Sequence, residues 1–112
     1  MGVVVEVYRI SKRFPKHEQY GLTQQMRRAA ISVTSNIAEG QSRRSKREFI
    51  RFIIIALGSP AELESQLLVA KRLALLDSAS TTPVLVLIGQ TGRLLRGLER
   101  SLVAHSAKEL PH

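Results

Sequence analysis

The stretch SKREFIRFIIIALGSPAELESQLLVAKRLA, residues 45–74, decides the fold. Its apolar residues recur at alternating spacings of four and three, which is the pattern of a helix in a left-handed bundle. The residues of this seam are Phe49, Ile53, Ala56, Pro60, Leu63, Leu67, Ala70 and Ala74. Ser45 and Glu48 match a capping box, so we expect the helix to begin at Lys46.

Residues around Pro60 favour a break in this helix when they are considered alone. Gly58 could end one helix, and Ser59 and Pro60 could begin another. A proline inside a helix costs about 3 kcal/mol, but the apolar register continues unchanged on both sides of it. We therefore predict one long helix over residues 46–75, kinked at Pro60.

Three other segments carry helical signals of different strength. Residues 22–39 keep the same apolar spacing and are followed by Gly40, a natural helix stop. Thr82 as N-cap and Pro83 as first helical residue predict a helix over 83–104 after a loop at 77–81. Residues 3–14 are ambiguous, because they are rich in β-branched residues and yet keep a helical spacing.

Length and composition limit the class of protein. A chain of 112 residues forms one domain, and 44% hydrophobic but only 4% aromatic residues favour helices packed on helices. Cysteine is absent, which fits a reducing cytosol and excludes thiolate metal sites. The apolar run at 52–57 is too short to span a bilayer, so we expect a soluble, cytoplasmic protein without a membrane partner.

Positive charge is concentrated in the first half of the chain. The net charge is +8 overall, +7 over residues 1–51 and +1 over residues 52–112. The densest cluster comprises Arg43, Arg44, Lys46, Arg47 and Arg51. Cations in the first turn of a helix oppose its macrodipole, so helix stability does not explain Lys46 and Arg47. The cluster is either a phosphate-binding surface or a solvated face.

A second basic group precedes it. Arg9, Lys12, Arg13 and Lys16 would form one stripe of a helix that reached residue 16. In a four-helix bundle this group could join the first cluster or lie at the opposite end. We include both groups among the candidate nucleic-acid-binding residues.

Several motifs resemble the 23S rRNA intervening-sequence protein family, also called the four-helix bundle protein family. They are FPK (14–16), YGLT (20–23), RRAAISV (27–33), SNIAEG (35–40), SKREFIRF (45–52) and ALGS (56–59), followed by Glu62, Leu63, Glu64, Gln66 and Leu67. The resemblance runs in order over residues 8–76. It implies an antiparallel, up-and-down four-helix bundle with its first helix over residues 3–14, as a single all-α domain over 1–112.

The resemblance also implies an assembly and possible partners. The family forms ring-like homopentamers, and it is similar to the accessory protein of diversity-generating retroelements, which partners a reverse transcriptase and binds nucleic acid. The family usually has about a dozen more N-terminal residues than this chain. We therefore expect a short first helix and a partly uncovered core.

The remaining polar and apolar candidates have structural interpretations. Residues Arg27, Arg28, Asn36 and Glu39 of the family's most recognisable stretch are expected to form buried polar pairs. The segment 49–57 is apolar on nearly every side, more than one bundle core needs. Its second apolar stripe, Ile50, Ile54 and Leu57, is expected to lie in a subunit interface.

Enzyme motifs are weak in this sequence. Residues 89–93 lack the lysine of a phosphate loop, Asp77 is the sole aspartate, and the three histidines are widely scattered. We expect no catalysis, metal or cofactor. The first hypothesis is a basic homo-oligomer that binds nucleic acid, RNA in particular, and the alternative is a protein-interaction scaffold for an enzyme such as a reverse transcriptase.

Overall fold

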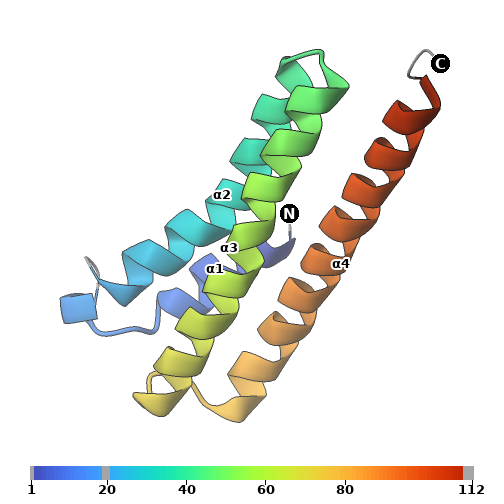
Figure 1. The fold of residues 1–112 in the computed structure, drawn as a ribbon. Helices are drawn as coiled ribbons and strands as arrows, with labels where there is room; N and C mark the ends of the chain where they lie inside the picture. Colours follow the sequence, from blue (N-terminus) through green and yellow to red (C-terminus); the bar gives the residue numbers. More distant parts are fainter. Residues whose placement is uncertain (1, 19–20, 110–112) are drawn as a thin grey trace.

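The computed structural model describes residues 2–18 and 21–109 and is a four-helix bundle (Figure 1). The helices are α1 (Gly2–Ser11), α2 (Leu22–Ser42), α3 (Lys46–Arg72) and α4 (Ser78–Glu109), with a short 3₁₀ helix, η1, at Lys16–Glu18. Consecutive helices run in opposite directions, and the molecule measures 58 × 23 × 18 Å. The predicted all-α bundle is confirmed.

The third helix is the centre of the bundle and packs on both α2 and α4. It continues through Pro60, as its apolar register predicted, and its seam is buried from Ile53 to Ala70. It begins at Lys46 because the Ser45 hydroxyl accepts a hydrogen bond from the Glu48 N–H at 3.3 Å. It ends at Arg72, before the predicted residue 75, because Ala74 adopts a left-handed backbone with φ 61°.

Gly40 does not end α2, contrary to the prediction. The helix continues to Ser42, and Gly40 is buried where α2 and α3 approach each other closely. A Cβ atom at this position would lie 2.9 Å from Phe52 Cβ and 3.0 Å from Phe49 Cδ1. The glycine is therefore needed for close helix packing and not for a turn.

The predicted start of α4 at Pro83 is also wrong. The helix begins at Ser78, because the Asp77 carboxylate accepts a 2.7 Å hydrogen bond from the Ser80 N–H. The Thr81 hydroxyl donates to the Asp77 carbonyl at 2.6 Å and holds the same turn. Pro83 lies inside the helix, where its ring nitrogen cannot donate a hydrogen bond to the Ala79 carbonyl.

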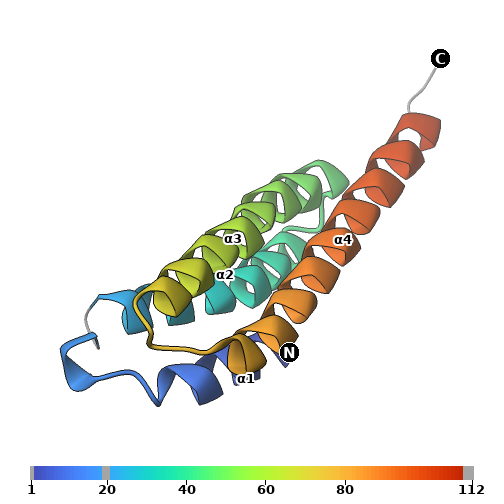
Figure 2. The same cartoon turned by 90° about the horizontal axis from the view of Figure 1, so that it is seen from below.

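The first helix is much shorter than the other three. Residues 3–10 form a helix rather than a strand, but it ends at Ser11 and not at residue 14. Figure 2 shows α1 beside the first half of α4, with the second half of α4 extending beyond it. The bundle therefore has four helices at the end near η1 and three at the end near the α2–α3 connection.

The buried apolar residues form two clusters that follow this difference. The lower core, near η1, consists of Val3, Val7, Ile10, Phe14, Met26, Ala29, Ala30, Leu63, Leu67, Ala70, Leu76, Val84 and Ile88. The upper core consists of Val33, Ile53, Ala56 and Leu95. Most of the packed interior is therefore at the four-helix end.

One helix, α3, is long and apolar enough by length and composition to cross a membrane. Over its most apolar window, with mean hydropathy 1.4, 39% is buried inside the bundle. A central helix of a bundle passes the same test, and α3 has that position here.

Candidate nucleic-acid interface

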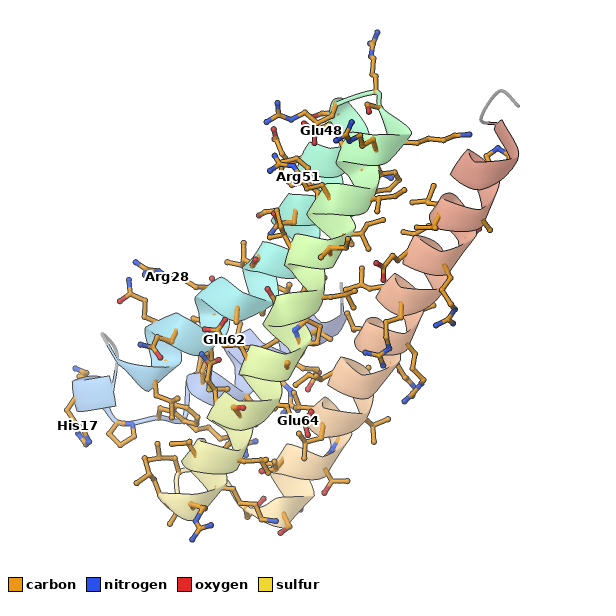
Figure 3. The ribbon with its side chains drawn as sticks, viewed as in Figure 1. His17, Arg28, Glu48, Arg51, Glu62 and Glu64 are labelled. Carbon is orange, nitrogen blue, oxygen red and sulfur yellow. The ribbon has the colours of Figure 1, made fainter. Side chains whose placement is uncertain are left out.

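Five basic residues surround the tight connection between α2 and α3, and we call them the basic tip. They are Arg43, Arg44, Lys46, Arg47 and Arg51. Arg43 is the C-cap of α2, Lys46 is the first residue of α3, and only Arg44 and Ser45 separate them. The connection is so short that residues from both helices lie at one end of the bundle (Figure 3).

Phe52 holds two of these arginines in place. The Arg43 Cζ atom lies 5.5 Å from the centre of the Phe52 ring, and the Arg51 Cζ atom lies 5.0 Å from it. Each guanidinium group also pairs with a carboxylate, Arg43 with Glu39 at 2.8 Å and Arg51 with Glu48 at 2.9 Å. Each of these contacts contributes little to stability at an exposed site, but together they restrict the two side chains. Arg43 and Arg51 are therefore held in position before any ligand binds.

Arg44 and Arg47 are exposed like Arg43 and Arg51 but lack their carboxylate partners. Neither has a carboxylate partner within the part of the chain that the structure describes. Arg44 also has a left-handed backbone, φ 57°, which costs a non-glycine residue roughly 1 kcal/mol. Ala74, which follows α3, has the same backbone conformation without a charged side chain. The left-handed conformation is therefore a property of these helix ends and does not require an arginine.

The N-terminal basic group lies at the opposite end of the bundle from the basic tip, and the structure divides it. The Arg9 guanidinium donates a hydrogen bond to the Glu6 carboxylate, and this bond lowers the pKa of Glu6. The Arg13 guanidinium donates to the Ser80 hydroxyl at 3.3 Å. Lys12 and Lys16 are exposed and line a hollow beside η1. The predicted single stripe does not form, because α1 ends at Ser11.

The four residues expected to form buried polar pairs have different environments. The half-buried Arg27 donates from Nε to the Ser11 hydroxyl at 2.9 Å and stacks on the Tyr8 ring at 4.5 Å. Asn36 bonds to the Ser32 carbonyl and hydroxyl in its own helix. Arg28 is exposed and points away from the bundle (Figure 3). Glu39 is also exposed, and it pairs with Arg43 of the tip and not with a buried residue.

The structure divides the apolar stripe expected at a subunit interface, because Leu57 packs against the upper core whereas Ile54 faces outward. Ile50 and Leu57 are half-buried, and Ile54 is 51% exposed. The same helix also exposes Ile55, Leu68 and Val69, and its C-cap, Leu73, is exposed as well. The single chain therefore leaves a large part of its most apolar helix uncovered.

A second apolar surface is the groove between α2 and α4 beyond the N-terminal end of α1. Its volume is about 390 Å³, and its apolar lining includes Val33, Ile37, Leu94, Leu95 and Leu98. Helical periodicity did not identify it as a groove, because these residues have the spacing of ordinary core positions. The shortness of α1 was the signal, since it leaves the groove open above Gly2.

Among the described residues no three histidine, aspartate or glutamate side chains lie close enough to bind a metal ion. Glu62 and Glu64, which the sequence places on different sides of α3, are directed differently in Figure 3. The basic tip is therefore the feature on which we base a functional proposal.

The comparison with protein families agrees with the fold and the motifs. The sequence model of the 23S rRNA-intervening sequence protein family matches residues 1–97. The chain belongs to this family. The match includes α1 and most of α4, and so extends beyond the residues 8–76 that carry the recognisable motifs. A search of curated proteins finds no match.

Proposed function

We propose that this chain is a non-enzymatic, homo-oligomeric bundle of the cytoplasm whose basic tip binds nucleic acid, RNA in particular, through its phosphates. The observation that supports the proposal is the basic tip itself, with five cations and the carboxylates of Glu39 and Glu48 at one end of the molecule. Arginine is well suited to phosphate because its planar group can donate two parallel hydrogen bonds.

The arrangement suggests separate tasks within the tip. Phe52 and the two carboxylates fix Arg43 and Arg51, whereas Arg44 and Arg47 are free to reach a ligand. Positioned cations lose less conformational entropy on binding than flexible ones. The tip reads no base edges in this proposal, so its affinity depends on phosphate contacts and not on sequence.

Self-association is the second part of the proposal. The exposed apolar residues of α3 would be covered by other copies, and the family resemblance favours five. Each chain has a formal charge of +8 and a mass of 12.5 kDa, so a ring would multiply both by the number of copies. Native mass spectrometry tests this directly, because a monomer at working concentration would contradict it.

RNA binding is best tested with the double variant Arg44→Gln/Arg47→Gln and fluorescence anisotropy on a structured RNA. Each lost phosphate contact should reduce the slope of log affinity against log salt by about 0.7 to 0.9. The matched control is Lys71→Gln/Arg72→Gln, which removes two charges from the other end of α3. An affinity independent of salt, or equal losses in both variants, would contradict the proposal.

Arg44→Gly separates binding from folding. Glycine adopts a positive φ without strain, so the variant should be as stable as the wild type or more stable. It should nevertheless bind RNA more weakly, because one exposed cation is lost. Weaker binding in a protein that unfolds at the same or a higher temperature cannot be attributed to a damaged fold.

The open groove between α2 and α4 favours a second function, that of a scaffold for a nucleic-acid enzyme such as a reverse transcriptase. Its apolar lining would accept a helix of another protein. In that case the purified chain alone should bind RNA without salt dependence or not at all. A complex with the enzyme should survive nuclease treatment and be lost in Leu94→Gln, a change in the 75% exposed leucine of the groove.

A further inference from the structure

A small hollow lies between the C-terminal end of α1, η1 and the first turn of α2, far from the basic tip. Its volume is about 210 Å³, which equals roughly seven waters at about 30 Å³ each. Its walls are formed by residues from three parts of the chain. They are Ser11, Lys12, Phe14, Pro15, Lys16, Thr23 and Arg27.

The charge of this hollow has one sign. Lys12, Lys16 and Arg27 line it, and they are the charged residues among its described lining. The other two cations of the N-terminal basic group, Arg9 and Arg13, bond elsewhere, to Glu6 and Ser80. Among the described residues no carboxylate pairs with the three lining cations. Three cations without a counter-charge indicate an anionic ligand.

Arg27 is held ready for such a ligand. Its Nε atom donates to Ser11, whose hydroxyl in turn donates to the Tyr8 carbonyl at 3.3 Å. The guanidinium group stacks on the Tyr8 ring. Neither terminal nitrogen has an acceptor within the described part of the chain. The hydrogen bond from Nε and the stacking on the ring fix the orientation of the guanidinium group. Its terminal N–H groups then form a fork, which is the geometry that binds a phosphate.

Thr23 supplies an observation that does not depend on charge. It is only 5% exposed, and its hydroxyl oxygen is buried without a hydrogen-bond partner. Buried hydroxyls without a partner are rare and often mark the place of a missing ion or water. Thr23 is in the first turn of the 21-residue α2, and the N-cap of this helix, Gly21, has no side chain that could cap the turn. The N–H groups and the macrodipole there favour an anion.

We propose that this hollow binds a phosphate group, with Arg27 as the oriented donor, Lys12 and Lys16 as charge partners and Thr23 as the buried hydroxyl. The group could be supplied by a small phosphate compound or by the end of a nucleic-acid strand, and both present the same oxygens. The site is at the other end of the bundle from the basic tip. It therefore does not depend on the RNA-binding proposal.

The first experiment titrates the full chain with inorganic phosphate at constant ionic strength, with chloride as the comparison, and follows the backbone amides by NMR. We expect saturable shifts in the amides of Thr23 and Gln24 that chloride does not produce. Arg27→Gln should weaken binding about tenfold. Lys12→Gln and Lys16→Gln should each weaken it about threefold without affecting the fold, since both side chains are exposed.

Thr23→Val distinguishes a ligand site from an ordinary packing defect. The substitution preserves shape and removes the orphan hydroxyl, so the protein should become no less stable. It should nevertheless lose phosphate affinity by about tenfold. Arg93→Gln on α4 is the charge-matched control for Arg27→Gln and should bind phosphate like the wild type. Absence of a saturable shift, or equal affinity in all these variants, would overturn the proposal.

The second experiment identifies the source of the phosphate in the Arg44→Gln/Arg47→Gln background. It compares inorganic phosphate with short oligonucleotides that carry a 5′-phosphate or a 5′-hydroxyl. If the 5′-phosphate oligonucleotide binds more tightly than inorganic phosphate, the ligand is the end of a nucleic-acid strand. If the two bind equally tightly, the ligand is a small phosphate compound. Equal shifts with both oligonucleotides would overturn the assignment to a strand end, because the two strands share their internal phosphodiesters and differ only in the terminal phosphate. Because the tip is disabled, failure of the RNA-binding proposal would leave this result unchanged.

Discussion

The two ends of the bundle contain the same α2, α3 and α4 but differ in what covers them. Near η1, α1 completes the bundle, and the lower core has thirteen buried residues. Among the described residues, α1 does not reach the end near the α2–α3 connection, where the upper core has four buried residues and the basic tip is at the surface. The difference suggests that the lower end supplies most of the stability and that the upper end presents charge and apolar surface.

Leucine truncation in the two cores should give the largest contrast. Leu67→Ala removes a fully buried side chain of the lower core, so we expect a loss of about 2–5 kcal/mol in unfolding free energy. Leu102→Ala, in a half-buried side chain packed against the upper core, should cost about 1 kcal/mol. Urea unfolding at one fixed protein concentration measures the loss of unfolding free energy in both variants. Equal losses would show that the upper core contributes as much as the lower one.

Two glycines of the upper half offer a second contrast, because the same substitution should have opposite effects. Gly40→Ala would force a Cβ atom against Phe52 and Phe49, at a cost of about 1–3 kcal/mol. Gly58 has no atom within 4 Å of such a Cβ, so Gly58→Ala should stabilise α3 by about 0.5–1 kcal/mol. Thermal unfolding of the pair decides this. A stabilising Gly40→Ala would mean that α2 and α3 do not pack closely.

Phe52 should be more important for the tip than for the core. Phe52→Leu removes two cation–π contacts, each about 0.5–1 kcal/mol at an exposed site. Phe52→Tyr keeps an aromatic ring and is the control. We expect a lower melting temperature and increased side-chain mobility of Arg43 and Arg51 by NMR in the leucine variant alone. Similar behaviour of the two variants would show that the ring acts only by filling volume.

The smallest expected effect is at the start of α4, in the lower half. The hydrogen bond from the Ser80 N–H holds the pKa of Asp77 below its usual value, so this carboxylate stabilises the fold above about pH 4. Its contribution is lost as the pH falls through the lowered pKa. Asp77→Asn should therefore reduce the melting temperature at pH 7, and the difference should narrow as the pH falls below 4. A difference independent of pH would contradict a role for the charge.

Local sequence rules predicted the helices best where a long register or a complete cap was present. The α3 seam overcame Pro60, and Ser45 with Glu48 placed the start of that helix correctly. The rules failed where two signals competed. Thr82 and Pro83 looked like a helix start, but Asp77 provided an earlier cap with two hydrogen bonds. Gly40 looked like a stop, although its role depends on Phe49 and Phe52 of another helix.

The sequence identified which basic residues could form a site, but it did not show how their side chains are arranged in space. The cluster at 43–51 could be identified as one group because it is contiguous in sequence and the α2–α3 connection is short. The N-terminal group could not be resolved, since its division depends on where α1 ends and on Glu6 and Ser80 as partners. Nothing in the sequence placed Arg27 and Thr23 beside Lys12 and Lys16.

The sequence by itself determined the helical class, the register of the long helices and the concentration of charge in residues 1–51. It could do so because periodicity and capping act within a few residues along the chain. The tertiary structure alone decided which cations are paired, which remain exposed, why Gly40 must be small and which side chains meet in the hollow beside η1. These properties depend on distances between helices, and the packing of one helix against another sets those distances.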